Sequence, residues 1–250
     1  MTRGEILREM GLGPVWKLRA TAAAKPAAES VAEPVTPAAP EPQLEPQLEP
    51  RLEPAPDVAV AQAGLSWEEL AAAVVACRAC RLCEARNQAV LGVGDRHADW
   101  LFVGEGPGAE EDQRGEPFVG QAGKLLDNML AAIGLKRGAD VYIANAVKCR
   151  PPENRTPTPE ETATCRPYLE RQIELIQPKL IVALGRPAAQ TLLQSEVKIG
   201  AARGKLHDYR GIPLIVTYHP AYLLRTLLDK ARAWEDLCFM RRSMKKLKGN

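Results

Sequence analysis

Four short apolar runs, separated by stretches with a helical pattern, limit what this chain can fold into. The runs are Trp100–Gly104, Val141–Ala146, Lys179–Gly185 and Ile212–Tyr218. The helical patterns cover Gln121–Ile133, Pro159–Ile176, Pro187–Leu193 and Lys230–Leu247. Continuous Val, Ile and Leu runs that alternate with helices are typical of a parallel sheet buried on both faces. We therefore predict an α/β protein with such a sheet at its centre.

The composition divides the chain into three parts. Residues 21–63 are rich in Ala, Pro and Glu and contain a four-residue repeat that begins at Glu41. Proline at this density blocks helix and sheet, so we predict a disordered, semi-stiff linker. Residues 1–20 are more apolar but too short for a core of their own, and we interpret them as a peptide that docks on a partner or back on the domain. The folded domain is expected at 64–250, its first helix capped by Ser66.

The net charge is +2, but it is unevenly distributed. Residues 1–63 have a balance of −3, the remainder has +5, and the last 26 residues are markedly basic. This favours a polyanionic partner such as nucleic acid, although a solvated basic helix would give the same pattern. No apolar run approaches the roughly 20 residues needed to span a bilayer, and the N-terminus lacks the apolar core of a secretory signal. We expect a soluble, cytoplasmic monomer.

Polar residues follow each predicted strand. They are Gly104-Glu105, Asn145, Gly185-Arg186 and His219-Pro220. Ligands of parallel sheets sit at the carboxyl ends of the strands, so these four clusters should converge on one edge. Glu105 is the one ionisable residue in Val103–Gly108 and His219 could donate to a developing anion, but an ordinary turn and a structural histidine are equally good interpretations of the pattern.

The cysteines point to metal ligation. There are six, Cys77, Cys80, Cys83, Cys149, Cys165 and Cys238. In a cytoplasmic protein, four thiolates are expected to bind zinc or a [4Fe–4S] cluster rather than form disulfides. The absence of a histidine among them and of a second Cys-x2-Cys pair favours iron–sulfur. Cys238, in a predicted helix, is expected to be structural.

Several ordered motifs together resemble the family 4 uracil-DNA glycosylases, over residues 75–247. They are Gly104-Glu105-Gly106-Pro107-Gly108 with Glu110-Glu111-Asp112, Gly115-x-Pro117-Phe118-Val119-Gly120-x-Ala122-Gly123, Asn145-x-Val147-Lys148-Cys149-Arg150-Pro151-Pro152 and His219-Pro220-Ala221-Tyr222-Leu223-Leu224. The resemblance implies a three-layer α/β/α sandwich around a four-stranded parallel sheet. It also implies a [4Fe–4S] cluster held by Cys77, Cys80, Cys149 and Cys165, with Cys83 a bystander or an alternative ligand.

The activity implied is hydrolysis of the N-glycosidic bond of uracil in DNA, which initiates base-excision repair. The uracil site would comprise Glu105, Gly106, Pro107, Phe118, Asn145 and His219. In it Phe118 would stack on the extruded base, Asn145 would read its Watson–Crick edge, and the catalytic pair would be His219, on the leaving anion, and Glu105, on water. Leu223 and Leu224 are expected to fill the vacated space in DNA, with Arg225 and Lys148 or Arg150 on phosphates.

One position departs from the wider superfamily. Its better-known branch carries an Asp immediately after the Glu105 position, where this chain has Gly106. The role of the Glu105 side chain is therefore less firmly implied than the roles of Asn145 and His219. Two other functions fit the same features: a non-catalytic iron–sulfur module that binds DNA, and a glycosylase of the same fold that acts on another deaminated base.

Overall fold

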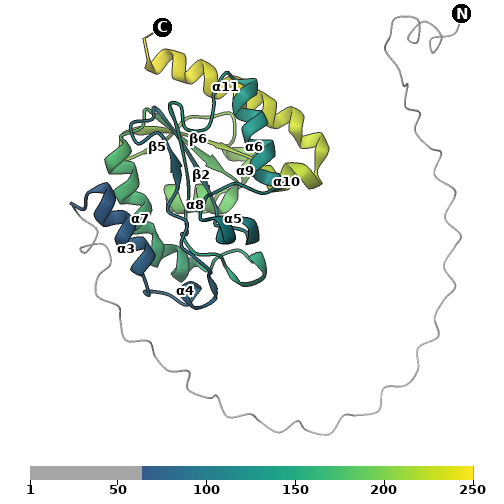
Figure 1. The fold of residues 1–250 in the computed structure, drawn as a ribbon. Coiled ribbons are helices and arrows are strands. Elements are labelled where there is room, and N and C mark those ends of the chain that lie inside the picture. Colours follow the sequence, from purple (N-terminus) through teal and green to yellow (C-terminus); the bar gives the residue numbers. More distant parts are fainter. Residues whose placement is uncertain (1–63, 250) are drawn as a thin grey trace, which may run out of the picture. The chain divides into compact units, whose positions relative to one another are not determined.

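A computed structural model describes residues 64–249 of the chain (Figure 1). The predicted docking peptide at 1–20 and the predicted linker at 21–63 lie outside the described residues, and both stay predictions. None of the helices in the described part is long and apolar enough to cross a membrane.

Within the described residues the chain forms one sheet of six strands, in the order β1-β3-β2-β4-β6-β5. The strands are β1 (Val93–Gly94), β2 (Trp100–Gly104), β3 (Val141–Asn145), β4 (Leu180–Leu184), β5 (His207–Tyr209) and β6 (Ile212–Thr217). The four central strands are parallel and coincide with the four predicted runs. The two edge strands pair antiparallel and were not predicted, because segments of two and three residues show no apolar run.

The helices of the described part precede, connect and follow these strands. They are α3 (Trp67–Ala76), α4 (Leu82–Ala85), α5 (Ala109–Arg114), α6 (Gln121–Ala132), α7 (Pro159–Ile176), α8 (Arg186–Leu193), α9 (Ile199–Ala202), α10 (Pro220–Arg225) and α11 (Lys230–Leu247), with 3-10 turns at Pro152–Asn154 and Leu227–Asp229. The four long predicted helices agree with α6, α7, α8 and α11 to within one residue. Ser66 caps α3 as predicted, through a reciprocal pair of hydrogen bonds with Glu69.

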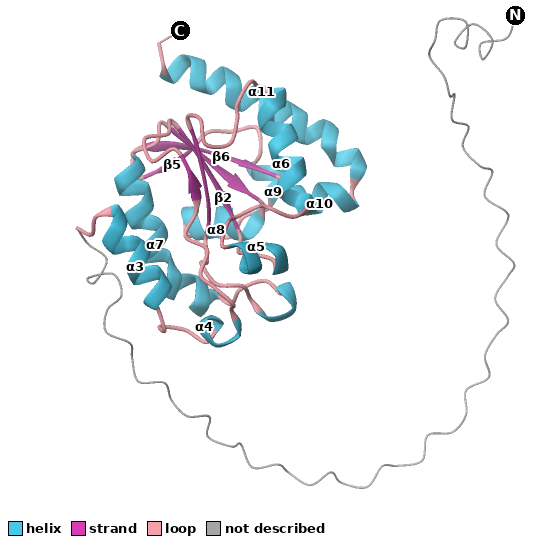
Figure 2. Ribbon diagram, viewed as in Figure 1, coloured by secondary structure: helices cyan, strands magenta, loops and turns pink. Residues whose placement is uncertain are grey.

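Helices cover both faces of the sheet (Figure 2). Because side chains alternate along a strand, Trp100 and Phe102 point to one face, where they pack with α6, α10 and α11. Leu101 and Val103 point to the other face and pack with α7 and α8. The predicted three-layer α/β/α sandwich with four parallel central strands is confirmed, and the two antiparallel edge strands extend it.

The strand order locates the place where a ligand should bind. From β2 the chain passes to β3 on one side and then returns across β2 to β4 on the other. In open α/β sheets such a reversal leaves a crevice outside the carboxyl ends of the two diverging strands. Here those ends carry Gly104-Glu105 and Gly185-Arg186.

Candidate active site

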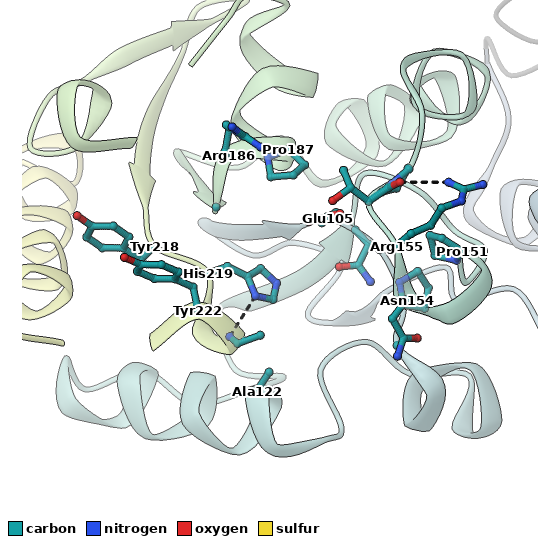
Figure 3. A pocket seen from close by; sticks show the side chains of 18 of the residues that line it. Glu105, Ala122, Pro151, Asn154, Arg155, Arg186, Pro187, Tyr218, His219 and Tyr222 are labelled. Carbon is teal, nitrogen blue, oxygen red and sulfur yellow. Dashed lines mark hydrogen bonds between the residues drawn. The ribbon is translucent and has the colours of Figure 1, made fainter. Parts of the chain in front are cut away.

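A cavity of about 800 Å³ opens at this carboxyl edge (Figure 3). Its walls include residues from the ends of all four parallel strands, namely Glu105, Asn145, Gly185 and His219. The expected convergence of the four polar clusters is thereby observed. All the residues expected to bind uracil line this cavity: Glu105, Gly106, Pro107, Phe118, Asn145 and His219.

Asn145 carries a buried acceptor without a partner. Its side chain is 2 % exposed, and its Oδ1 accepts no hydrogen bond from any described residue. Leaving a buried polar atom unpaired costs roughly 1–3 kcal/mol, and because this oxygen lies in the cavity wall a ligand can supply the missing donor. Asn145 pairs in register with Gly104 on β2, and a Cβ at Gly104 would lie 2.5 Å from this Oδ1. Only glycine leaves room for the amide here.

Phe118 is held in a strained conformation beside the amide. Its φ of 55° lies in the left-handed region, which costs a non-glycine residue about 1–3 kcal/mol. Arg137 donates to the carbonyl oxygens of Pro117 and Phe118, both at 2.8 Å. The Phe118 ring is buried and lies 5.5 Å from the His219 ring, centroid to centroid. Such over-determined strain is typical of residues that position a ligand.

Glu111 joins two loops of the cavity. One carboxylate oxygen accepts from the main-chain nitrogens of Val119 and Gly120, at 2.9 and 3.1 Å, just after Phe118. The other accepts from the main-chain nitrogen of Gly108, at 3.1 Å. The loop after β2 and the loop of Phe118 are therefore fixed to one side chain on α5.

His219 is a neutral donor at the start of α10. Its Nδ1 accepts a hydrogen bond from the main-chain nitrogen of Ala221, at 3.1 Å, so the proton of the neutral ring resides on Nε2. Burial, with the nearby charge of Arg225, lowers the pKa of His219 to about 4. At neutral pH the ring can therefore offer an N–H without carrying a charge.

Glu105 lies half-buried at the end of β2. Burial raises the pKa of its carboxyl group, while a hydrogen bond from Thr156 and the charge of Arg186 oppose the rise. A carboxyl group whose pKa is shifted towards neutrality is a candidate base for a water molecule. Figure 3 shows Glu105 and Arg155 together on one side of His219.

Basic side chains surround the opening of the cavity. Arg155, Arg186, Lys198 and Arg225 all line it and all are exposed. Arg155 is also bound to Glu161 through two hydrogen bonds of 2.8 and 2.7 Å. Cations around an apolar and amide-lined cavity suit a ligand that is a polyanion with a flat polar group.

A second, much smaller cavity collects the cysteines. Cys77, Cys80, Cys83, Cys149 and Cys165 line it, whereas Cys238 lies on α11. Arg86 Nη1 lies 2.8 Å from Cys149 Sγ, and the main-chain nitrogen of Lys148 lies 3.2 Å from Cys165 Sγ. Within residues 64–249, no group of three or more His, Cys, Asp or Glu side chains has the arrangement that holds a metal ion. The five thiols line one cavity, and four of them would satisfy an iron–sulfur cluster, in which each thiolate binds a different iron.

Comparison with known proteins identifies the family. The family model described as "Uracil DNA glycosylase superfamily" matches residues 91–238, which hold every strand end of the cavity. This chain belongs to that superfamily. The match agrees with the resemblance stated from the motifs alone.

Curated members of the superfamily include close relatives. A type-4 uracil-DNA glycosylase of Archaeoglobus fulgidus is 47% identical over 167 residues, which cover 64% of this chain and 83% of the relative. The type-4 enzyme of Thermotoga maritima is 49% identical, covering 62% and 82%. The type-4 enzyme of Pyrobaculum aerophilum is 43% identical, covering 64% and 86%.

The structure buries two of the residues that were expected to contact DNA. Leu223 is only 1 % exposed and belongs to the core beneath α10, so it cannot enter DNA in this conformation. Leu224 is 41 % exposed, and Arg225 lines the cavity opening, as a DNA contact requires. Lys148 is also unavailable to phosphates, because it is 1 % exposed and its ammonium bonds the carbonyl oxygen of Asn145 at 2.8 Å and the side chain of Gln172.

Several residues of the site were given no role from the sequence, although Glu111 and Tyr222 stand in the quoted motifs. Arg137 and Glu111 hold the Phe118 loop, yet neither stands at a strand end. The signal for Glu111 was present, since an acid three residues after Gly108 is typical of a helix start. Tyr218 and Tyr222 line the cavity as well, and an aromatic residue gives no sequence signal that separates a cavity wall from a core.

Proposed function

We propose that this chain hydrolyses the N-glycosidic bond of uracil in DNA, releasing free uracil and leaving an abasic site, the first step of base-excision repair. Relatives 43–49% identical, all named type-4 uracil-DNA glycosylases, support this activity. The single observation that carries it in the structure is the buried, unpartnered Oδ1 of Asn145 in the cavity wall.

The Asn145 amide suits uracil better than cytosine. Its Oδ1 would accept from N3–H of uracil, and its Nδ2 would donate to O4. Cytosine has no N3–H, and at position 4 it presents an amino group, which would face a second donor. The base must leave the duplex stack to reach this position, and the ring of Phe118 would stack on it there.

Bond cleavage needs stabilisation of the leaving base. When the C1′–N1 bond breaks, its electron pair stays on uracil and negative charge reaches O2. The Nε2–H of His219 would donate to that oxygen, together with main-chain N–H groups of the loop after β2. A neutral donor suits this role, because its pKa of about 4 keeps the ring uncharged around pH 7.

Water completes the reaction at the sugar. Glu105 would orient a water molecule towards C1′ and accept its proton as the new C1′–O bond forms, and the proton finally resides on the released uracil or in solvent. The raised pKa of Glu105 makes the carboxylate a better proton acceptor than an exposed one. Its negative charge would also favour the positive charge that develops on the sugar.

DNA would lie across the opening of the cavity. Arg186, Lys198 and Arg225 are placed to contact phosphates on either side of the extruded nucleotide. We propose Leu224 as the side chain that fills the space left in the stack, because it is 41 % exposed and precedes Arg225, which lines the cavity.

The cysteine cavity fits the iron–sulfur cluster that the family resemblance implies. Cys77, Cys80, Cys149 and Cys165 would hold it, and the guanidinium of Arg86 on Cys149 Sγ would offset the charge of the thiolates. Bound there, a cluster would link the end of α3 and the loop after it to the segment after β3 and to Cys165 on α7. We expect iron, sulfide and broad absorption near about 400 nm in purified protein. Cys165→Ser should lose them, and Cys83→Ser should retain them.

The activity is tested with purified full-length protein and oligonucleotides that carry one uracil, thymine or cytosine, single-stranded or paired. Alkali-labile sites should form at uracil alone.

Asn145→Ala and His219→Ala should each lower kcat/KM by about 100-fold or more, whereas His97→Ala, at an exposed histidine, should not change it. Glu105→Ala should lower kcat by about 100-fold. Binding of the strands without any cleavage would favour the non-catalytic DNA-binding module, and cleavage at hypoxanthine instead would favour another deaminated base.

A further inference from the structure

The main cavity is larger than uracil requires. Its volume of about 800 Å³ lies towards the upper end of the roughly 300–1,000 Å³ of pockets that hold drug-sized ligands, and a single pyrimidine ring is far smaller. The residues assigned to uracil occupy one part of it. The lining also includes Tyr218, Tyr222, Val197 and Ile199, to which the proposed reaction gives no role, and we refer to their side of the cavity as its second part.

Two tyrosines form the wall of this second part. The rings of Tyr218 and Tyr222 are stacked, with centroids 5.3 Å apart and planes 13° apart. Figure 3 shows both on the opposite side of His219 from Glu105. Tyr218 is 9 % exposed, and Tyr222 is partly exposed to the cavity.

The aromatic pair is fixed from behind. The hydroxyl group of Tyr222 donates to Asp229 at 2.6 Å, and Arg232 holds the other oxygen of Asp229 at 3.0 Å. The guanidinium group of Arg203 lies 5.5 Å from the centre of the Tyr218 ring and is itself bound to Asp236 at 3.0 Å. A rigid aromatic surface loses little entropy when a flat ligand stacks on it.

Positive charge lies beside the pair. Lys198 and Arg225 also line the cavity and are exposed, Lys198 between Val197 and Ile199 and Arg225 three residues after Tyr222. An aromatic platform flanked by cations is the usual arrangement for binding an unpaired nucleotide, because the ring takes the base and the cation takes the backbone.

We propose that this part of the cavity binds the nucleotide next to uracil, with its base against Tyr222 and its phosphate at Lys198 and Arg225. The inference rests on the proposed function and extends it. The enzyme would then bind two adjacent unpaired nucleotides of DNA rather than one extruded nucleotide. Base–aromatic stacking of this kind tolerates any sequence, because every base presents a flat face.

The test uses single-stranded oligonucleotides with one uracil in which the 5′ or the 3′ neighbour is replaced by a stable abasic analogue. For the wild-type protein, loss of the neighbouring base on one side should lower kcat/KM about tenfold. Tyr222→Leu should lower kcat/KM about tenfold on the intact strand and show no further loss on the abasic-neighbour strand. Tyr222→Phe keeps the ring but loses the hydrogen bond to Asp229, so whatever its activity on the intact strand, its roughly tenfold response to the abasic neighbour should remain.

Trp234→Leu supplies the matched control, since Trp234 is a 50 % exposed aromatic residue on α11 outside the cavity. Its response to the abasic neighbour should equal that of the wild type. If Tyr222→Leu lost a further tenfold in kcat/KM on the abasic-neighbour strand, the two changes would be independent and the inference would be wrong. It would also be wrong if the wild-type protein kept its full kcat/KM on both modified strands. If Tyr222→Leu fails to fold, the kcat/KM of the wild-type protein on the two modified strands still tests whether the neighbouring base is bound. If the wild type releases no uracil from the unmodified strand, the proposed function itself is wrong, and that result is distinct from the others.

Discussion

The ammonium group of Lys148 donates a 2.8 Å hydrogen bond to the main-chain carbonyl oxygen of Asn145, the residue proposed to read uracil. The main-chain nitrogen of the same lysine bonds Cys165 Sγ at 3.2 Å. One buried residue of the cysteine cavity thus contacts a residue that lines the main cavity, and the end of β3 is held from the side of the cysteines. Gln172 shares the ammonium group and itself donates to Leu91 O at 2.9 Å, so the bond belongs to a buried network.

Lys148→Met should weaken this network while nearly keeping the volume of the side chain. It leaves the Asn145 carbonyl and the Gln172 side-chain oxygen unpaired, which should lower the free energy of unfolding by about 2 kcal/mol. The end of β3 should then shift, and kcat/KM for uracil release should fall about tenfold. Denaturant unfolding and uracil release measure the two effects, with Lys136→Met at an exposed lysine as control. Unfolding curves that coincide with the wild type would contradict the prediction.

Gly104→Ala should close the uracil cavity without unfolding the sheet. The added Cβ would lie 2.5 Å from Asn145 Oδ1 and 2.6 Å from the Phe118 ring, so one of them must move. A misplacement of this size should lower kcat/KM by about 100-fold. Gly200→Ala is the matched control, since a Cβ there would meet no atom within 4 Å and its φ is not positive. Equal activity of the two variants would show that the Gly104 contact has no role.

Arg137→Met should release the loop that carries Phe118. Two carbonyl oxygens would lose their donors, and the positive φ of Phe118 would no longer be imposed from that side. We expect KM to rise about tenfold with a smaller change in kcat, because the substitution affects how the base is bound rather than the bond that breaks. Steady-state kinetics separates the two constants. Arg96→Met, at an exposed ion pair with Glu68, should change neither.

His219 should make the stability of the folded domain depend on pH between about 6.5 and 4. Burial lowers its pKa to about 4 in the folded protein, whereas in the unfolded chain it stays near 6.5. As the pH falls through this window the unfolded chain takes up a proton that the folded protein does not, so stability falls, by up to about 3 kcal/mol. Above pH 6.5 the contribution is constant.

The measurement for this prediction is the free energy of unfolding at pH 7, 5.5 and 4.5, for the wild type and for His219→Gln. The difference between the two should change steadily as the pH is lowered. A difference that is independent of pH would mean that the folded protein protonates His219 as easily as the unfolded chain.

The central sheet was predictable because each of its strands is a continuous run of Val, Ile and Leu that must be buried on both faces. The convergence of Glu105, Asn145 and His219 followed from the same rule, since parallel strands end at one edge. The orientation of α10 was not predictable. A helix of six residues is too short to show a periodicity, so the sequence could not tell buried Leu223 from exposed Leu224.

Contacts between side chains and main-chain atoms distant in the sequence could not be predicted from the sequence either. Arg137 reaches the carbonyl of Phe118 across 19 positions in the sequence, and Lys148 turns inwards although lysine is almost always exposed. Nothing in local composition marks such residues, because their partners are main-chain groups that every residue possesses.

The order of the strands along the chain determines when the cavity can be completed during translation. The cavity needs Glu105 from β2, Asn145 from β3 and His219 from the end of β6, and β6 pairs within the parallel sheet with β4 alone. A chain still emerging from the ribosome can build β2, β3 and β4 but lacks His219, which completes the cavity. Release of uracil by a nascent chain would therefore report that translation has passed α10 and that the last parallel strand has docked.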